Sequence, residues 1–120
     1  MGIQCSQGVV TNSRGMSDGG RGIYGVTVNN CYGTSQSATG LQATVATGCT
    51  GESVSGAGVV GEMVTNCHAK SNTGAYALFA RVATSCTAER NGGVAFSVTT
   101  ANGCVSIAGT VDATNKYNMP

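Results

Sequence analysis

The chain has 120 residues, of which 9% are charged, 5% are aromatic and 19 are glycine, and its formal net charge is +1. Six basic and five acidic residues, with no block of one sign, argue against electrostatic capture of nucleic acid or of an anionic membrane. No stretch reaches the ~20 apolar residues of a membrane-spanning helix, and the first thirty residues lack the pattern of an export signal.

Cysteines recur along the chain at a nearly constant spacing. They stand at positions 5, 31, 49, 67, 86 and 104, so that successive separations are 26, 18, 18, 19 and 18 residues. A short fixed period is typical of a solenoid, in which each repeat is one turn of a coil that stacks on its neighbours. We therefore expect residues 1–120 to form a single all-β domain, a parallel β-helix with about 18 residues per coil.

The first interval and the last residues depart from this period. The stretch from Cys5 to Cys31 is eight residues longer than one coil, and a Gly-rich polar run occupies residues 12–22. We interpret this run as an inserted loop. Because the ends of a solenoid expose unpaired strand edges, we interpret residues 111–120 as a C-terminal cap or tail.

Alignment of the repeats on their cysteines gives columns of similar residues. The positions eight, six and four residues before each cysteine are apolar or small, as in Leu41, Ala43 and Val45. We expect all three to point inward, since alternate residues of a strand share one face. The cysteines and the small residues two places after them, such as Gly33 and Gly51, predict a second, narrow inner face.

The cysteines allow three interpretations: disulfides, a metal site or buried thiols. Side chains that point the same way from parallel neighbours have poor disulfide geometry. No Cys-x-x-Cys spacing exists, and the only histidine, His68, is expected to point outward. The sequence favours a structural ladder of buried, reduced thiols in a reducing compartment such as the cytoplasm, and no cofactor. The members of this ladder are Cys31, Cys49, Cys67, Cys86 and Cys104.

Two outward columns contain charges that alternate in sign from coil to coil. Three residues after successive cysteines stand Glu52, Lys70 and Glu89, and five residues before them stand Glu62 and Arg81. In-register parallel stacking places such neighbours ~4.8 Å apart, where opposite charges gain ~0.2–1 kcal/mol. We therefore expect inter-coil ion pairs within both columns.

The repeat also bears on the handedness of the coil. Eighteen residues with three short strands also suit a left-handed hexapeptide helix, which needs a large aliphatic residue at every sixth place. The sixth places here hold small residues, and one interval has 19 residues, so we favour the right-handed form. The sixth places from Cys31 are Ser37, Ala43, Cys49, Ser55, Gly61 and Cys67.

The repeat motif carries a family resemblance. The run N-C-Y-G-T-S-x-S-x-x-G-L-x-A from Asn30, the T-G-C or T-N-C endings and the closing N-K-Y-N-M-P at residues 115–120 resemble uncharacterised bacterial right-handed parallel β-helix proteins, which have a pectate-lyase-like architecture. The likeness covers residues 30–104 and the tail. It implies a fold and no activity, because no position matches the catalytic motifs of lyases or hydrolases with this architecture.

The sequence offers no catalytic constellation. The column of His68 contains hydroxyl residues but no acid, so that no Ser-His-Asp triad can be assembled. Glu52 and Glu62 are expected on different faces of one coil, which leaves no facing pair of carboxyls for glycoside hydrolysis. We therefore expect no enzyme and no catalytic residue.

One outward column of the main strand contains Tyr24, Val60 and Phe79, which together predict an apolar interface. We expect the chain to associate with itself there, as a homo-dimer or homo-trimer. The favoured function is a non-catalytic structural or adhesive module.

Two other functions stay open. The alternative is a carbohydrate-binding or carbohydrate-processing β-helix with a glycan as its partner. The third is an ice-binding protein, which the threonine column of Thr47, Thr65 and Thr84 indicates. A second rank of threonines, five residues before each cysteine, is interrupted by Glu62 and Arg81.

Overall fold

The computed structural model describes residues 2–117, the side chains of residues 6, 91 and 92 excepted. Within residues 2–117 there are eleven strands and no helix, and the strands form one continuous sheet in which every strand pair is parallel. None of the described residues forms a helix long and apolar enough to span a membrane.

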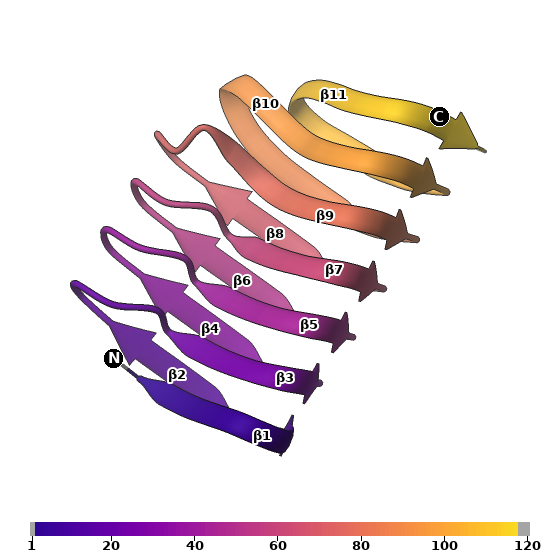
Figure 1. The fold of residues 1–120 in the computed structure, drawn as a ribbon. Helices are drawn as coiled ribbons and strands as arrows, with labels where there is room; N and C mark the ends of the chain where they lie inside the picture. The colour runs from indigo at the N-terminus through magenta and orange to yellow at the C-terminus, as the bar shows by residue number, and fades with distance from the viewer. Residues whose placement is uncertain (1, 118–120) are drawn as a thin grey trace.

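The strands lie in two stacks (Figure 1). The first stack contains the longer strands β1 (Ile3–Thr11), β3 (Ile23–Asn29), β5 (Leu41–Thr47), β7 (Val59–Thr65) and β9 (Tyr76–Thr84). The second contains the short strands β2 (Arg14–Ser17), β4 (Tyr32–Ser35), β6 (Thr50–Ser53) and β8 (His68–Ser71). The last two strands, β10 (Thr87–Asn102) and β11 (Val105–Tyr117), each run through both stacks.

The chain winds as a right-handed coil of about 6 turns. In Figure 1 the strands β1 to β9 of the first stack lie nearer the viewer and run to the right, and the short strands return behind them as the chain climbs. Tyr32 pairs with Thr50 and Thr50 with His68, which are steps of one 18-residue period. The predicted all-β parallel solenoid is therefore confirmed.

Each strand of the first stack bends, and the bend changes which residues face inward. In β5, Leu41, Ala43 and Ala46 are buried, whereas Thr44 is exposed and Val45 is partly exposed. Ala43 and Val45 each pair with residues of the neighbouring strands, and the register skips Thr44 between them. It skips the equivalent residue in those neighbouring strands too. Alternation holds only along a straight strand, and two consecutive residues face outward at the bend. The prediction that the position four residues before each cysteine points inward is therefore wrong.

The predicted inserted loop at residues 12–22 is also wrong, because these residues contain part of a regular coil. Arg14–Ser17 forms β2, which pairs with β4 from Arg14 opposite Tyr32 onward. Ser13 lies one period before Cys31 and donates its backbone N–H to the Cys31 Sγ at 3.5 Å. Cys5 pairs instead with Gly25, so it does not belong to the cysteine column.

The irregularity of the first coil lies in β1. The four-residue step from Cys5 to Val9 faces the two-residue step from Gly25 to Thr27 in β3. This is a β-bulge, and Gly8 within it has a φ of 99°, a backbone conformation that glycine adopts without steric cost. The extra residues are thus accommodated inside a strand.

Most of the predicted C-terminal cap is the last strand of the coil. Val111 lies opposite Phe96 and Tyr117 lies opposite Asn102, so that residues 111–117 extend the same ladder. Residues 118–120 of the predicted tail lie outside the described residues.

The interior is a narrow column of stacked apolar side chains. One column, eight residues before each cysteine of the ladder, contains the four largest fully buried side chains together with Val59, and none of its members has exposed surface: Ile23, Leu41, Val59, Leu78 and Phe96. Each packs on its equivalent in the next coil, so that burial depends on stacking, as in other solenoids.

The residue before each cysteine of the ladder has left-handed backbone, and this includes Ser85 before Cys86, with a φ of 52°. Asn30 has a φ of 53°, Gly48 of 64° and Asn66 of 53°, and Asn12 in the first coil has a φ of 48°. Glycine and asparagine adopt this conformation at the lowest cost. This explains the T-G-C and T-N-C endings, and it shows that the first coil makes the same turn before Ser13.

The two stacks approach each other closely where glycines face each other. A Cβ atom on Gly51 would lie 2.2 Å from the carbonyl oxygen of Gly58, and one on Gly33 would lie 2.3 Å from that of Gly40. In the next coil the equivalent positions hold two buried alanines, Ala69 and Ala77. The first coils are therefore too narrow for a methyl group that the later coils accommodate.

This difference predicts that one added methyl group destabilises the folded protein at some glycine positions and not at others. Gly51→Ala should lower the free energy of unfolding by about 1–3 kcal/mol, the usual cost of overpacking, in urea titrations followed by circular dichroism. Gly19→Ala is the control, because a Cβ atom on Gly19 would meet nothing within 4 Å beyond its two chain neighbours. Equal stability of the two variants would contradict the close approach of the stacks.

Candidate functional site

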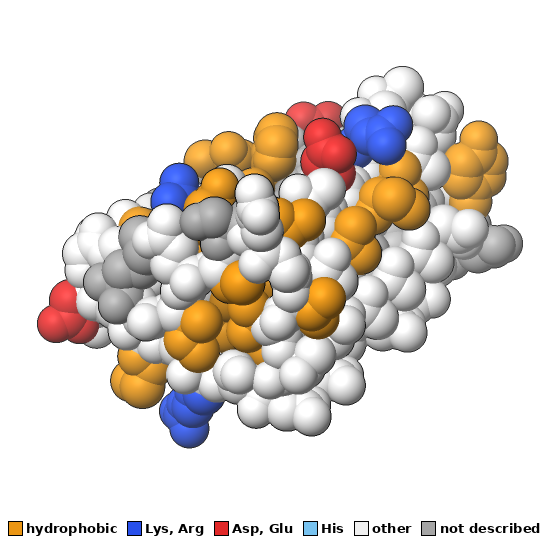
Figure 2. All heavy atoms as spheres, turned by 60° about the horizontal axis from the view of Figure 1, so that its bottom comes forward, with side chains coloured by type: hydrophobic (Ala, Val, Ile, Leu, Met, Phe, Trp, Pro, Cys, Tyr) orange, Lys and Arg blue, Asp and Glu red, His pale blue; other side chains and the backbone are white. Residues whose placement is uncertain are grey.

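The outer surface carries apolar clusters separated by few charges. Figure 2 views the molecule from the side of β1 and shows several groups of apolar side chains, with few basic and acidic side chains among them. Two hollows in this surface bring together residues from successive coils, one over each stack of strands.

The first hollow, here the apolar groove, lies over the first stack and has a volume of about 340 Å³. Tyr24 of β3, Val60 of β7 and Phe79 of β9 line it and belong to one column of the ladder, with Gln42 between Tyr24 and Val60. The three residues predicted from the sequence as an interface are therefore brought together. Their role as an interface stays a prediction.

The apolar groove is hollow because small residues form its floor. Gly25, Ala43 and Gly61 line it and stack in adjacent coils, next to the column of Tyr24 and Phe79. Phe79 projects beside this floor with 43% of its surface exposed. Its ring centroid lies 5.0 Å from that of Tyr76, a separation typical of stabilising aromatic pairs.

At one end of the apolar groove, an arginine contacts two of the residues that line it. The Arg21 guanidinium lies over the Tyr24 ring, 4.6 Å from its centroid, and the Arg21 Nε donates a hydrogen bond to Gln42 Oε1 at 2.5 Å. These contacts orient Tyr24 and Gln42 before any partner binds. Sequence analysis missed Arg21, because nothing in the 12–22 run indicated that it would reach a neighbouring coil.

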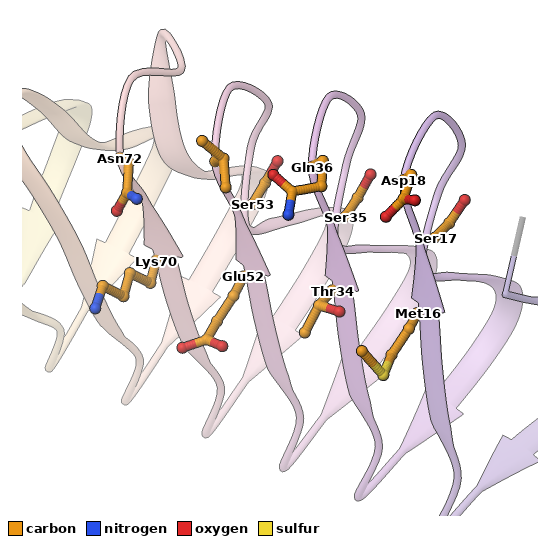
Figure 3. Close-up of a pocket in the computed structure, with 11 residues that line it drawn as sticks. Met16, Ser17, Asp18, Thr34, Ser35, Gln36, Glu52, Ser53, Lys70 and Asn72 are labelled. Carbon is orange, nitrogen blue, oxygen red and sulfur yellow. The ribbon is translucent and has the colours of Figure 1, made fainter.

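The second hollow, here the polar groove, lies over the short strands and has a volume of about 260 Å³. Figure 3 shows Met16, Thr34, Glu52 and Lys70 in one row on successive strands. A second row near the turns contains Asp18, Gln36 and Asn72. The groove thus presents carboxylate, amide, hydroxyl and ammonium groups within one elongated hollow.

The serines beneath the polar groove have structural roles. The hydroxyl of Ser35 donates to the Gly20 carbonyl at 2.6 Å and accepts the backbone N–H of Ala38 at 3.0 Å. Ser53 makes the equivalent bonds to Ala38 and Gly56. Both hydroxyls are thus engaged in holding the turns that follow the short strands.

The predicted charge columns are in register, but the charges do not touch. Glu52 pairs with Lys70 and Lys70 with Glu89 along the ladder, and the strand pairing brings Glu62 beside Arg81. Among these five described residues, however, no N–O contact lies within 4.0 Å. The predicted inter-coil ion pairs therefore stay predictions.

Glu52 has a different partner. The Tyr32 hydroxyl donates a hydrogen bond to the Glu52 carboxylate, and this bond raises the pKa of Tyr32. The Arg14 guanidinium lies 4.9 Å from the centroid of the Tyr32 ring. Glu52 is thereby held at the edge of the polar groove.

The cysteine column lies inside the coil. All six cysteines are free thiols, and those of the predicted ladder are buried, while Cys5 is only partly buried. The thiol of Cys49 donates to the Val28 carbonyl at 3.3 Å, and that of Cys86 to the Val64 carbonyl at 3.3 Å. A hydrogen bond with the Cys49 thiol, together with burial, raises the pKa of Cys67.

The described residues offer no metal centre and no triad. No group of three or more His, Cys, Asp or Glu side chains among them could hold a metal ion. His68 lies between Thr50 and Thr87 on the outer side of the short strands, as its column predicted.

Comparison with models of known protein families, with curated protein sequences and with solved structures finds no match.

The cysteine column predicts a single reactive thiol. At pH 8 an aromatic disulfide reagent should modify Cys5 rapidly, because Cys5 is the only one of the six that is not buried, and the reagent cannot reach a buried sulfur while the coil is folded. The other five should react only in denaturant. The measurement is the absorbance of released thiolate over time, and a Cys5→Ser variant should lose the rapid phase. More than one rapid thiol in the native protein would contradict the burial of the column.

Proposed function

We propose that the chain is a non-catalytic structural or adhesive module whose copies associate through the apolar groove. The observation that carries this proposal is the exposure of Phe79 (43%) and Val26 (41%) beside a hollow lined by Tyr24 and Val60. A contiguous apolar patch is costly to leave in water and commonly marks an interface. The proposed partner is a second copy of this chain, and neither nucleic acid nor a membrane is a proposed partner.

The shape of the groove supports self-association. A two-fold interface uses the same patch on both copies, so the patch needs a projection and a matching hollow. Phe79 supplies the projection, and the floor of Gly25, Ala43 and Gly61 supplies the hollow. Because the continuous ladder holds these positions, little conformational entropy is lost on association. A dimer is therefore the favoured form, with a trimer as the alternative.

This proposal predicts that a charge at Phe79 separates the copies. Wild-type protein should show a mass that rises from one chain toward two with concentration in light scattering. Phe79→Asp should weaken association roughly thirtyfold, which corresponds to about 2 kcal/mol for a central apolar contact.

The matched control is Val54→Asp. Val54 is 40% exposed but lies at the polar groove, so its substitution should leave the mass unchanged. A wild-type mass of one chain at every concentration would refute the proposal. Equal weakening by Val54→Asp would also refute it.

The polar groove supports a second candidate, a glycan-binding β-helix. Its carboxylates, amides and hydroxyl match the donors and acceptors of sugar hydroxyls, and the side chains of Met16 and Val54 provide apolar contacts for the sugar ring. The groove runs across successive coils (Figure 3), a direction that suits an extended chain of sugar units.

This candidate predicts that Glu52 contributes to sugar binding. An array of neutral and acidic oligosaccharides should give at least one ligand, and Glu52→Gln should weaken its binding about tenfold in calorimetry, since hydrogen bonds to charged groups are worth ~1.5–3 kcal/mol. Glu62→Gln is the control, because Glu62 lies outside the polar groove. Absence of any bound oligosaccharide would rule out the candidate, and turnover of a ligand would rule out a non-catalytic role.

We also propose that the chain is related to the bacterial right-handed β-helix proteins of pectate-lyase-like architecture that its repeat resembles. The right-handed coil and the turn geometry behind the T-G-C and T-N-C endings support this relationship. Homologues that carry their cysteines without the preceding left-handed turn would argue against it.

A further inference from the structure

The bend in the first stack creates an outer face that alternation alone does not predict. Beyond the bend, the positions four and two residues before each cysteine both face outward, and the residue between them is buried, as Val45, Ala46 and Thr47 illustrate. The first rank of this face comprises Val9, Thr27, Val45, Met63, Val82 and Thr100. The second rank stands two residues later on each strand and includes Thr47, Thr65 and Thr84. We call this two-rank surface the threonine face.

From this surface we infer that the chain binds ice, with the threonine face as the site and the ordered water of the crystal surface as the ligand. The inference is independent of the proposed self-association, because the threonine face and the apolar groove lie on opposite sides of the bend.

The backbone gives the threonine face a fixed two-dimensional repeat. Paired strands lie ~4.8 Å apart along the coil, and residues two apart on one strand are ~6.7 Å apart. Pairing is in register for six successive strands, from Val9 in β1 to Thr100 in β10. A crystal surface is itself a periodic array, so a rigid periodic face can make the same contact at many points without ordering flexible segments.

The side chains of the threonine face suit water in a lattice. Threonine and asparagine in the second rank supply hydrogen-bonding groups, while valine, methionine and threonine methyl groups in the first rank cannot compete for the hydrogen bonds of water. Neither rank contains a charged residue from Val9 to Asn102. Charged groups would retain their own strongly bound hydration shells.

Other occupants fit the threonine face less well. Val9 is 58% exposed and Met63 49% exposed, but the second rank is polar throughout, whereas the core of a stable protein interface is mostly apolar. Crystalline glycans are commonly bound by flat aromatic side chains, which combine a large apolar surface with a polar edge. The two ranks contain one aromatic residue, Tyr117, which lies opposite Asn102 at the end of the second rank, so no row of aromatic side chains runs along the face.

The bend also removes an apparent objection to ice binding. In the sequence, the column five residues before each cysteine could supply threonines beside the column of Thr47, Thr65 and Thr84, but Glu62 and Arg81 interrupt it. In the structure these two residues lie at the bend itself, where both are exposed. They flank the threonine face without dividing it, because Met63 and Val82 occupy the first rank in their coils.

The test uses the purified chain and a single growing ice crystal in a nanolitre osmometer. Wild-type protein should facet the crystal and open a measurable gap between its melting and freezing temperatures. Thr65→Lys, at the centre of the face, should reduce this gap roughly tenfold, because the hydrated ammonium group holds the lattice away. Thr87→Lys is the matched control, since Thr87 is also partly exposed but lies on the short-strand side of β10, and it should keep the full gap.

Circular dichroism melts establish that both variants fold, and Val45→Lys replaces Thr65→Lys if the latter does not. Round, unfaceted crystals with wild-type protein would overturn the inference. Equal loss in Thr65→Lys and Thr87→Lys would overturn it too. Binding to microcrystalline cellulose or chitin without ice shaping would assign the face to a glycan instead, and a smaller light-scattering mass for Thr65→Lys would assign it to a second copy.

Discussion

The in-register parallel ladder of backbone hydrogen bonds is the constraint on which the rest of this structure depends. Every strand bonds to the equivalent strand of the next coil, from β1 to β11, so that each residue stacks on its own counterpart one period away. A small substitution in one coil is therefore felt by the coils on both sides. The apolar column of Leu41, Val59 and Leu78 and the thiol column are both direct products of this stacking.

Local backbone chemistry determines where the ladder turns. The left-handed residue before each cysteine of the ladder closes one side of the coil, and facing glycines such as Gly51 and Gly58 let the two stacks approach. The bend within the first stack is different, because no special residue marks it. At the bend the column comprises Val26, Thr44, Glu62, Arg81 and Thr99, which share only exposure to solvent.

The candidate surfaces follow from the same geometry. The apolar groove lies on one side of the bend, the threonine face on the other, and the polar groove over the short strands. Each is a set of columns, so each repeats its chemistry along the coil instead of concentrating it at one point. Such surfaces suit extended or periodic partners, including a second coil, a glycan chain or a crystal lattice, better than they suit a small substrate.

Much of this arrangement could be predicted from the residues, because periodic stacking imposes a periodic sequence. The cysteine spacing determined the parallel coil and its period of about 18 residues, and the outward column of Tyr24, Val60 and Phe79 identified the residues that line the apolar groove. Only the tertiary structure decided the position of Cys5, the strand within residues 12–22 and the outward side of Val45 and Met63. The physical reason is that bulges and bends depend on how neighbouring coils pair, and pairing across ~18 residues leaves no mark on local alternation.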